Sequence, residues 1–180
     1  MSSLYTTFRQ TIGRDGPDFS WLDSLDEQQK EKLTKSLTEE CEYFNILALG
    51  FLKCRSAVEQ LKRWLASDES DVCLAASRAL WDIEQSEAML KPTCKLVRQG
   101  ESPQQKSLAI GLLAHVRTPL VFDTLLDALL DSDYLIRRYA ASVLSLNSSR
   151  KTSESTIKSN LLEFDQDRIS AFSAKMRAKI

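Results

Sequence analysis

The 180-residue chain has little glycine and little proline, five and four residues respectively, and it contains a single histidine. β-Sandwiches, β-barrels and nucleotide-binding α/β folds need many more of these residues in their turns. Hydrophobic residues at 43% and charged residues at 27% are ordinary for a folded domain, which excludes disordered and collagen-like chains. The scarcity of turn residues therefore predicts a helical protein.

Metal and disulfide sites also lack support in the sequence. The four cysteines form no CxxC pair and lie 13, 19 and 21 residues apart, at Cys41, Cys54, Cys73 and Cys94. We expect reduced, half-buried helix cysteines, no metal and no cofactor. His115 is predicted to be a partly exposed helix residue that neither binds a ligand nor takes part in catalysis.

The charges are nearly balanced, with 24 basic and 25 acidic side chains and a formal net charge of −1. A dedicated DNA-binding protein needs a strong positive field, so nucleic acid is not the expected partner. The first fifteen residues lack the apolar core of a signal peptide, and the longest apolar run, Ile46 to Leu52, is too short to cross a bilayer. We therefore expect a cytoplasmic protein that does not bind membranes.

Aliphatic residues recur along the chain at intervals of 31, 33 and 30 residues. One column of equivalent positions is Leu49, Leu80, Leu113 and Val143, and a second column, three positions later, is Leu52, Ile83, Val116 and Leu146. Within each repeat, spacings of three and four put side chains on one helical face, and a polar break of six marks a turn. Each repeat is therefore predicted to be a helix hairpin, as in solenoid proteins.

The repeat pattern divides the chain into a cap, four hairpins and a second cap. Residues 1–42 are expected to form an N-terminal helical cap, in which Asp26 and Gln29 resemble a capping box at the start of a helix. The repeats occupy residues 43–164, as hairpins at about 43–70, 71–101, 102–132 and 133–164. Residues 165–180 are expected to form a C-terminal capping helix.

Prolines mark some of the predicted helix starts. Pro103 and Pro119 suit the first turn of a helix, where the missing N–H costs nothing. Pro92 leaves two alternatives open. If its helix starts at Ser86 or Glu87, the proline kinks the second turn, and if the helix starts at Lys91, the proline is harmless.

Two segments of the repeats, ALGFLKCRSAVEQLKRWL (48–65) and DVCLAASRALWDI (71–83), resemble the HEAT-like repeat of bacterial proteins, the type found in phycobilisome lyases. The resemblance covers residues 43–146. It implies an all-α fold, namely a short right-handed α-solenoid of about four HEAT-like hairpins with helical caps. Families with this repeat include protein-binding scaffolds, bilin lyases, a DNA-glycosylase class and an iron hydroxylase, and small members look similar to immunity proteins encoded beside secreted toxins.

The enzymes of this family depend on particular side chains, whose presence or absence can be read from the sequence. The hydroxylase needs several His-Glu pairs, which one histidine cannot supply. The glycosylase holds an extruded base with aromatic and carboxylate side chains, for which the candidates here are Trp64, Trp81, Asp123 and Asp127. Both tryptophans are more simply interpreted as packing residues. No nucleophile elbow, phosphate-binding loop or zinc signature occurs, so we expect no catalytic residues.

The second helix of each hairpin is expected to line the concave side of such a solenoid. Its charged positions are the predicted partner-binding residues, Lys62, Arg63, Lys95, Arg98, Asp123, Asp127 and Asp131. The three aspartates are spaced by four residues and repel one another, which a basic partner would relieve, although a merely solvated face is the alternative. We expect a non-catalytic protein-binding module, in its most specific form an immunity or adaptor protein that occludes a toxin or effector. A glycosylase-type enzyme and a bilin lyase or chaperone are the alternatives.

Overall fold

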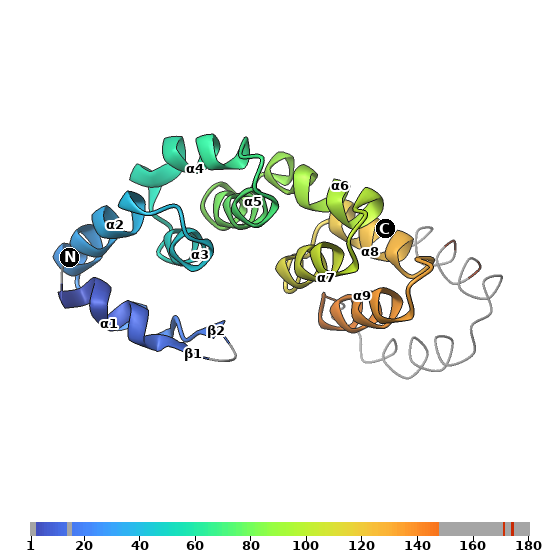
Figure 1. Ribbon diagram of the computed structural model, residues 1–180, viewed down its shortest axis with the longest axis horizontal. Helices are drawn as coiled ribbons and strands as arrows, with labels where there is room; N and C mark the ends of the chain where they lie inside the picture. The colour runs from blue at the N-terminus through green and yellow to red at the C-terminus, as the bar shows by residue number, and fades with distance from the viewer. Residues whose placement is uncertain (1–2, 14–15, 148–170, 172–173, 175–180) are drawn as a thin grey trace. The chain divides into compact units, whose positions relative to one another are not determined.

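The computed structural model describes residues 3–13, 16–147, 171 and 174, and this part of the chain is almost entirely helical. Its longer elements are the α-helices α1 (Ser3–Thr11), α2 (Glu27–Glu39), α3 (Tyr43–Phe51), α4 (Val58–Leu65), α5 (Ser70–Glu84), α6 (Lys91–Gln99), α7 (Pro103–Leu112), α8 (Pro119–Ala128) and α9 (Tyr134–Asn147) (Figure 1). Three short 3-10 helices separate some of them, η1 (Ser20–Ser24), η2 (Arg55–Ala57) and η3 (Glu87–Leu90). The all-α fold class is confirmed.

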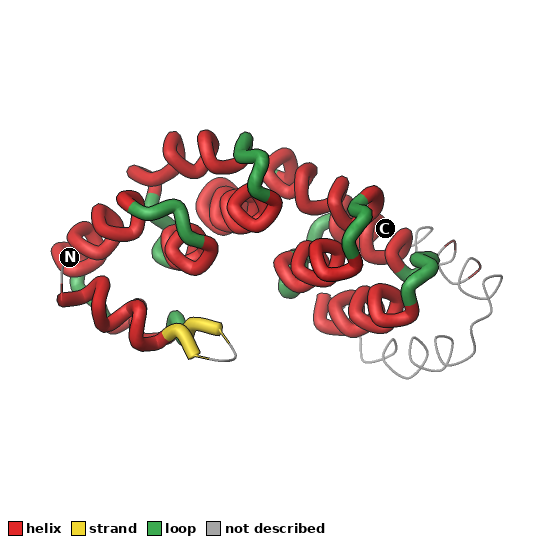
Figure 2. Tube along the Cα trace, in the orientation of Figure 1, coloured by secondary structure: helices red, strands yellow, loops and turns green. Residues whose placement is uncertain are grey.

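The sequence predicts no strand, and among the described residues one very short ladder departs from this prediction. Strands β1 (Ile12–Gly13) and β2 (Gly16–Pro17) pair antiparallel directly after α1 (Figure 2). With two residues per strand, the ladder is too short to change the fold class.

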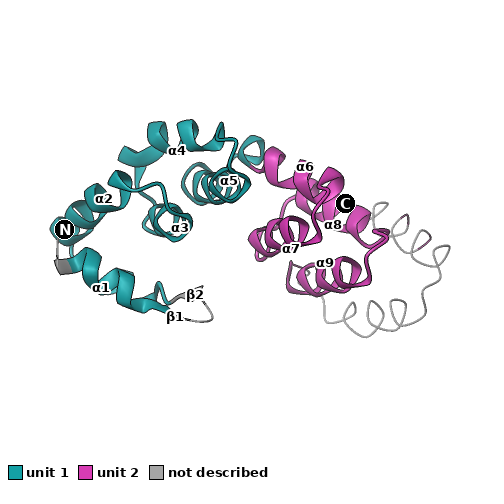
Figure 3. Cartoon of the chain, viewed as in Figure 1, with its two compact units in different colours: residues 1–89 teal, residues 90–180 magenta. Residues whose placement is uncertain are grey.

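The chain divides into two compact units, Met1–Met89 and Leu90–Ile180 (Figure 3). In the first unit α5 packs against both α3 and α4, and α2 packs against α1 and α3. In the second unit α6 packs beside α8 and α7 beside α9, and the two layers meet through the contacts of α6 with α7 and of α8 with α9. The predicted second helix of the fourth hairpin and the capping helix at 165–180 lie outside the described residues, apart from residues 171 and 174.

The first aliphatic column of the sequence is buried, whereas the second is buried only at Val116, with Leu52 and Ile83 partly buried. Leu49, Leu80, Leu113 and Val143 are all buried, which confirms the first column. In the second column Leu146 is exposed. In the first unit α3 and α5 approach so closely that a Cβ on Gly50 would lie 2.5 Å from the Cα of Ala79, so only glycine fits there.

Helix starts follow the local signals of the sequence. Asp26 accepts a hydrogen bond from the backbone N–H of Gln29 at 2.8 Å, and the Gln29 side chain accepts one from Asp26 N at 3.0 Å, so the capping box at the start of α2 is confirmed. Pro103 and Pro119 are the first residues of α7 and α8. Because α6 starts at Lys91, Pro92 lies in its first turn and does not kink it.

Three first helices of the predicted hairpins end in the same unusual backbone conformation. Lys53 after α3, Gln85 after α5 and His115 after α7 have φ values of 51°, 54° and 63°, in the left-handed region. This conformation reverses the chain at helix ends and is usually taken by glycine. The expectation that His115 lies in a helix is wrong, because it is an exposed residue of the turn before α8.

Candidate functional site

Helices α6 and α8 lie side by side in the second unit and supply four of the predicted partner-binding residues. The buried face of α6 consists of Thr93, Cys94 and Val97. Their spacing leaves Lys95 and Arg98 on the exposed side of the same helix. Asp123 and Asp127 of α8 are partly exposed between its buried positions Val121, Thr124, Leu125, Leu126 and Ala128.

Arg98 joins the two helices through two ion pairs. Its Nε donates to Asp127 Oδ2 at 2.7 Å, and its Nη2 donates to Asp123 Oδ2 at 2.9 Å. All three side chains remain partly exposed to solvent. The repulsion expected between Asp123 and Asp127 is therefore relieved within the chain, by a cation from the neighbouring helix.

Asp131 does not belong to this cluster. Its Oδ2 accepts from Lys106 Nζ of α7 at 2.6 Å, and its Oδ1 accepts from the backbone N–H of Asp133 at 2.9 Å. Burial acts to raise the pKa of the Asp131 carboxyl, but the hydrogen bonds from Lys106 and Asp133 and the charges of Lys106 and Arg137 outweigh it and lower that pKa. Asp131 thus holds the segment between α8 and α9 in place.

The first unit holds the two remaining predicted residues, both exposed and on α4. Lys62 Nζ lies 3.5 Å from Glu59 Oε1 and 3.5 Å from Glu84 Oε1, so it pairs within its own helix and with the end of α5. Arg63 is exposed beside it. The predicted set is therefore divided between two units and, within the second unit, between two separate clusters.

An open groove of about 400 Å³ lies beside Arg98. Its lining combines charged and polar side chains with apolar ones, and consists of Val97, Arg98, Gln99, Asp127, Ala128, Leu130 and Asp131. Such a groove has room for a side chain or a short polypeptide segment.

Aromatic and cysteine side chains form no alternative site among the described residues. Trp64 is buried, as expected of a packing residue, and Trp81 is partly buried. None of the four cysteines forms a disulfide, and burial raises the pKa of the Cys54 and Cys73 thiols, which makes them less reactive. Within the described ranges, no group of three or more histidine, cysteine, aspartate or glutamate side chains is placed to hold a metal ion.

One surface was missed in the sequence. On α9, Tyr134, Leu135, Tyr139 and Leu146 are exposed large hydrophobic residues. The spacing of Leu135, Tyr139 and Leu146, by four and seven, is itself a helical-face signal. Leu146 also fits the period of the second column, so the repeat pattern predicts that it is buried.

Comparisons with known proteins add no relative. No family model, no curated protein and no solved structure matches the chain. No helix among the described residues is long and apolar enough to cross a membrane.

Proposed function

We propose that the chain is a non-catalytic protein-binding module built of HEAT-like hairpins in a short right-handed solenoid, and that a polypeptide partner docks on the α6–α8 face of the second unit. This face is defined by Lys95, Arg98, Asp123 and Asp127. The repeat period and the helix-pair packing support the architecture. The geometry around Arg98 supports the docking surface.

The observation that carries the proposal is the fixed position of a partly exposed arginine. The two carboxylates of α8 hold the Arg98 guanidinium in one orientation, so a partner does not have to immobilise it. Immobilising a long side chain on binding costs about 0.5–1.5 kcal/mol, which pre-organisation avoids. A guanidinium has five N–H donors, and arginine is enriched among the residues that dominate binding energy.

The surroundings of Arg98 favour a polypeptide over a nucleic acid. Lys95 and Arg98 are cationic whereas Asp123 and Asp127 are anionic, so the face carries both signs of charge. A groove for a phosphate backbone is expected to be continuously positive. The adjacent groove adds apolar lining from Val97, Ala128 and Leu130, on which an apolar side chain of a partner can rest. A toxin or effector that the chain occludes is the specific partner class we propose.

The test first captures binding partners from a lysate of the native host on the immobilised chain. The binding of each purified partner is then measured directly. We expect Arg98→Glu to weaken binding at least about tenfold, since charged interface residues set specificity and association rate. The variant should keep its helical circular dichroism, because exposed ion pairs contribute about 0–1 kcal/mol to stability. Arg117→Glu, the same change at an exposed arginine between α7 and α8, is the matched control.

The binding of a fluorescent DNA duplex to the same proteins distinguishes the proposal from the glycosylase alternative. The proposal predicts weak DNA binding by the wild-type chain at about 150 mM salt. The glycosylase alternative predicts tight binding that strengthens when Asp123 and Asp127 are both changed to lysine. Unchanged partner affinity of Arg98→Glu, or tight DNA binding without any directly bound protein, would overturn the proposal.

A further inference from the structure

Arg98 keeps hydrogen-bond donors that its two ion pairs do not use. A guanidinium has five N–H groups, one on Nε and two on each terminal nitrogen. Nε donates to Asp127 and Nη2 donates to Asp123, so Nη1 takes part in neither ion pair. The two N–H groups of Nη1 and one of Nη2 are therefore left for other acceptors, on a side chain that is 30% exposed.

The direction of these donors is fixed by the two ion pairs. Nε and Nη2 form one edge of the planar guanidinium, and Asp123 and Asp127 occupy this edge from the neighbouring helix. Nη1 and Nη2 form a second edge, which faces a different direction because the group is planar and rigid. This second edge presents two parallel N–H groups, which fit either a carboxylate or carbonyl oxygens.

The charges around Arg98 favour a carbonyl over a carboxylate. Arg98, Asp123 and Asp127 are one cation and two carboxylates, with a net charge of −1. The exposed Lys95 on the same helix brings the α6–α8 face to zero, and not to a positive charge. A carboxylate of a partner has to approach beside two carboxylates, and like charges disfavour this. A main-chain carbonyl is a neutral acceptor and meets no such repulsion.

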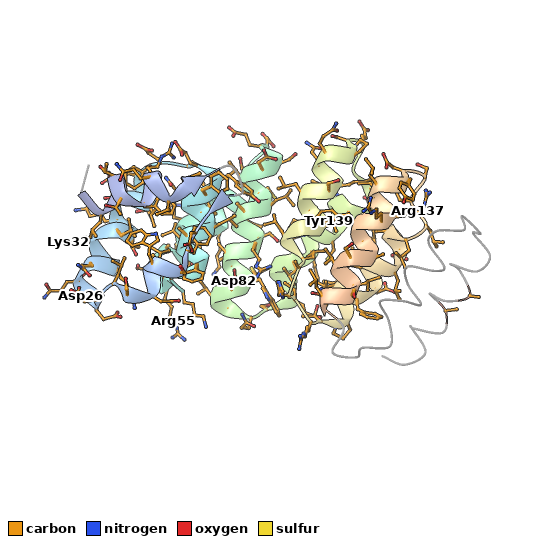
Figure 4. All side chains as sticks on the ribbon, turned by 90° about the horizontal axis from the view of Figure 1, so that it is seen from below. Asp26, Lys32, Arg55, Asp82, Arg137 and Tyr139 are labelled. Atoms are coloured by element: carbon orange, nitrogen blue, oxygen red, sulfur yellow. The ribbon has the colours of Figure 1, made fainter. Side chains whose placement is uncertain are left out.

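A second arginine of the same unit binds carbonyls through its Nη1. Arg137 of α9, labelled in Figure 4, donates from Nη1 to the main-chain carbonyls of Asp131 and Ser132, each at 2.8 Å. These two residues lie outside the helices, in the segment between α8 and α9. One arginine nitrogen of this fold thus holds two successive carbonyls of a non-helical segment.

A partner of Arg98 must offer carbonyls that its own structure leaves unpaired. Carbonyls inside helices and sheets are used in hydrogen bonds, whereas those of an extended segment are available. The groove beside Arg98 is open, has about 400 Å³ and is lined in part by Val97 and Leu130, which suits a chain without charged side chains. Building on the proposed function, we propose that Arg98 binds a main-chain carbonyl of an extended, uncharged segment of the partner, and not an acidic side chain.

A random library of ten-residue peptides, acetylated and amidated at their ends, tests this proposal without a known partner. Peptides are retained if they bind the wild-type chain and bind Arg98→Glu at least about tenfold more weakly. Arg117→Glu is the matched control and should bind like the wild type. We expect aspartate and glutamate to be depleted in the retained peptides relative to the library.

The library also distinguishes a failure of this inference from a failure of the proposed function. Retained peptides enriched in aspartate or glutamate would overturn the inference, whereas the proposed function would stand. A library without any Arg98-dependent peptide would overturn the inference too. An Arg98→Glu variant that also binds every captured partner normally would overturn the proposed function as well.

Ester substitution in a retained peptide identifies the acceptor. Replacing one amide by an ester weakens the carbonyl as an acceptor and leaves the side chains unchanged. At the position that contacts Arg98, we expect the ester to weaken binding to the wild type about two- to tenfold. Binding to Arg98→Glu should change much less at this position, since the contact is already lost. If no ester position depended on Arg98 in this way, the proposal would be wrong.

Changing Asp123 and Asp127 together to asparagine separates a neutral acceptor from a charged one. A carbonyl acceptor predicts that the change weakens peptide binding about two- to tenfold, because Arg98 must then be immobilised on binding. A carboxylate acceptor predicts stronger binding, since the repulsion is removed. Circular dichroism checks that the variants remain helical. An increase in affinity would overturn the inference.

Discussion

Lys106 of α7 and Asp131, which follows α8, form an ion pair with 2.6 Å between Nζ and Oδ2 and with side chains only 17% and 11% exposed. The pair connects two helices of the second unit at the point where the chain turns toward α9. The Asp131 carboxylate also accepts the backbone N–H of Asp133, so it is bound from two sides. Removing one partner of such a pair leaves a poorly solvated charge behind, which is strongly unfavourable.

Lys106→Met is therefore expected to destabilise the second unit. Methionine keeps most of the apolar stem and removes the ammonium, so the change isolates the charge-assisted hydrogen bond. Hydrogen bonds to charged groups contribute about 1.5–3 kcal/mol, and we expect a loss of that order in urea unfolding. Lys95→Met, at an exposed position of α6, is the matched control with an expected change within about 0.5 kcal/mol. Equal unfolding midpoints for the two variants would contradict the role of the pair.

The same pair predicts how stability depends on pH. The pKa of Asp131 is lowered in the folded chain, so its carboxylate contributes stability at pH values above the unfolded pKa of about 3.9. This contribution is lost as the pH falls through the lower, folded pKa. The stability difference between the wild type and Asp131→Asn, measured by urea unfolding, should therefore stay constant above about pH 5 and shrink as the pH falls below it. A difference that stays flat over this range would refute the assignment.

Two helical glycines are expected to respond differently to alanine. At Gly50 the new Cβ would lie 2.5 Å from the Ala79 backbone, so α3 and α5 must separate. Overpacking of this kind costs about 1–3 kcal/mol, more than the roughly 1 kcal/mol that alanine gains in a helix. At Gly111 the new Cβ would meet the Tyr139 hydroxyl at 2.7 Å, and the end of a side chain can move away. We expect Gly50→Ala to lower the melting temperature and Gly111→Ala to leave it nearly unchanged.

The effect of the contact at Gly111 can be measured separately in a variant that lacks the Tyr139 hydroxyl. Tyr139→Phe removes the hydroxyl, after which the nearest remaining atom, Cζ, lies 3.6 Å from the new Cβ. In this background Gly111→Ala should raise the melting temperature, because only the gain in helix propensity remains. A decrease in both backgrounds would show that α7 and α9 are packed more tightly there than their contacts indicate.

The left-handed residues provide a test that does not depend on contacts. His115 has a φ of 63° and an exposed side chain, so glycine should relieve part of the roughly 1–2 kcal/mol that this conformation costs an L-residue. His115→Ala keeps the Cβ and should give no such gain. Thermal melts of the two variants are compared directly. A stabilisation by alanine as large as that by glycine would indicate that the imidazole itself is unfavourable.

Helix starts could be predicted from the sequence because their signals are local. Asp26, Pro103 and Pro119 act on the first turn that follows them, wherever that helix packs. The three left-handed residues could not be predicted, because lysine, glutamine and histidine, unlike glycine, do not by themselves indicate a positive φ. That conformation is imposed by the packing of the two helices on either side of each turn.

The candidate site was only partly predictable, for geometric reasons. The spacing of Asp123, Asp127 and Asp131 places all three on one face only if the helix continues, but α8 ends at Ala128. The chain then turns, and Asp131 contacts Lys106 instead. The ion pairs of Arg98 depend on α6 lying beside α8, a relation between helices about 25 residues apart that no local pattern encodes.

The organisation of the first unit also affects how the chain folds during its synthesis. Helices α1 to α5 pack against near neighbours along the chain, all within Met1–Met89. A ribosome releases these residues before those of the second unit, and contacts between near neighbours form quickly. The close contact between Gly50 and Ala79 can therefore form while synthesis continues. The nascent first unit then buries its leucines, out of reach of chaperones and proteases, before the last helices emerge.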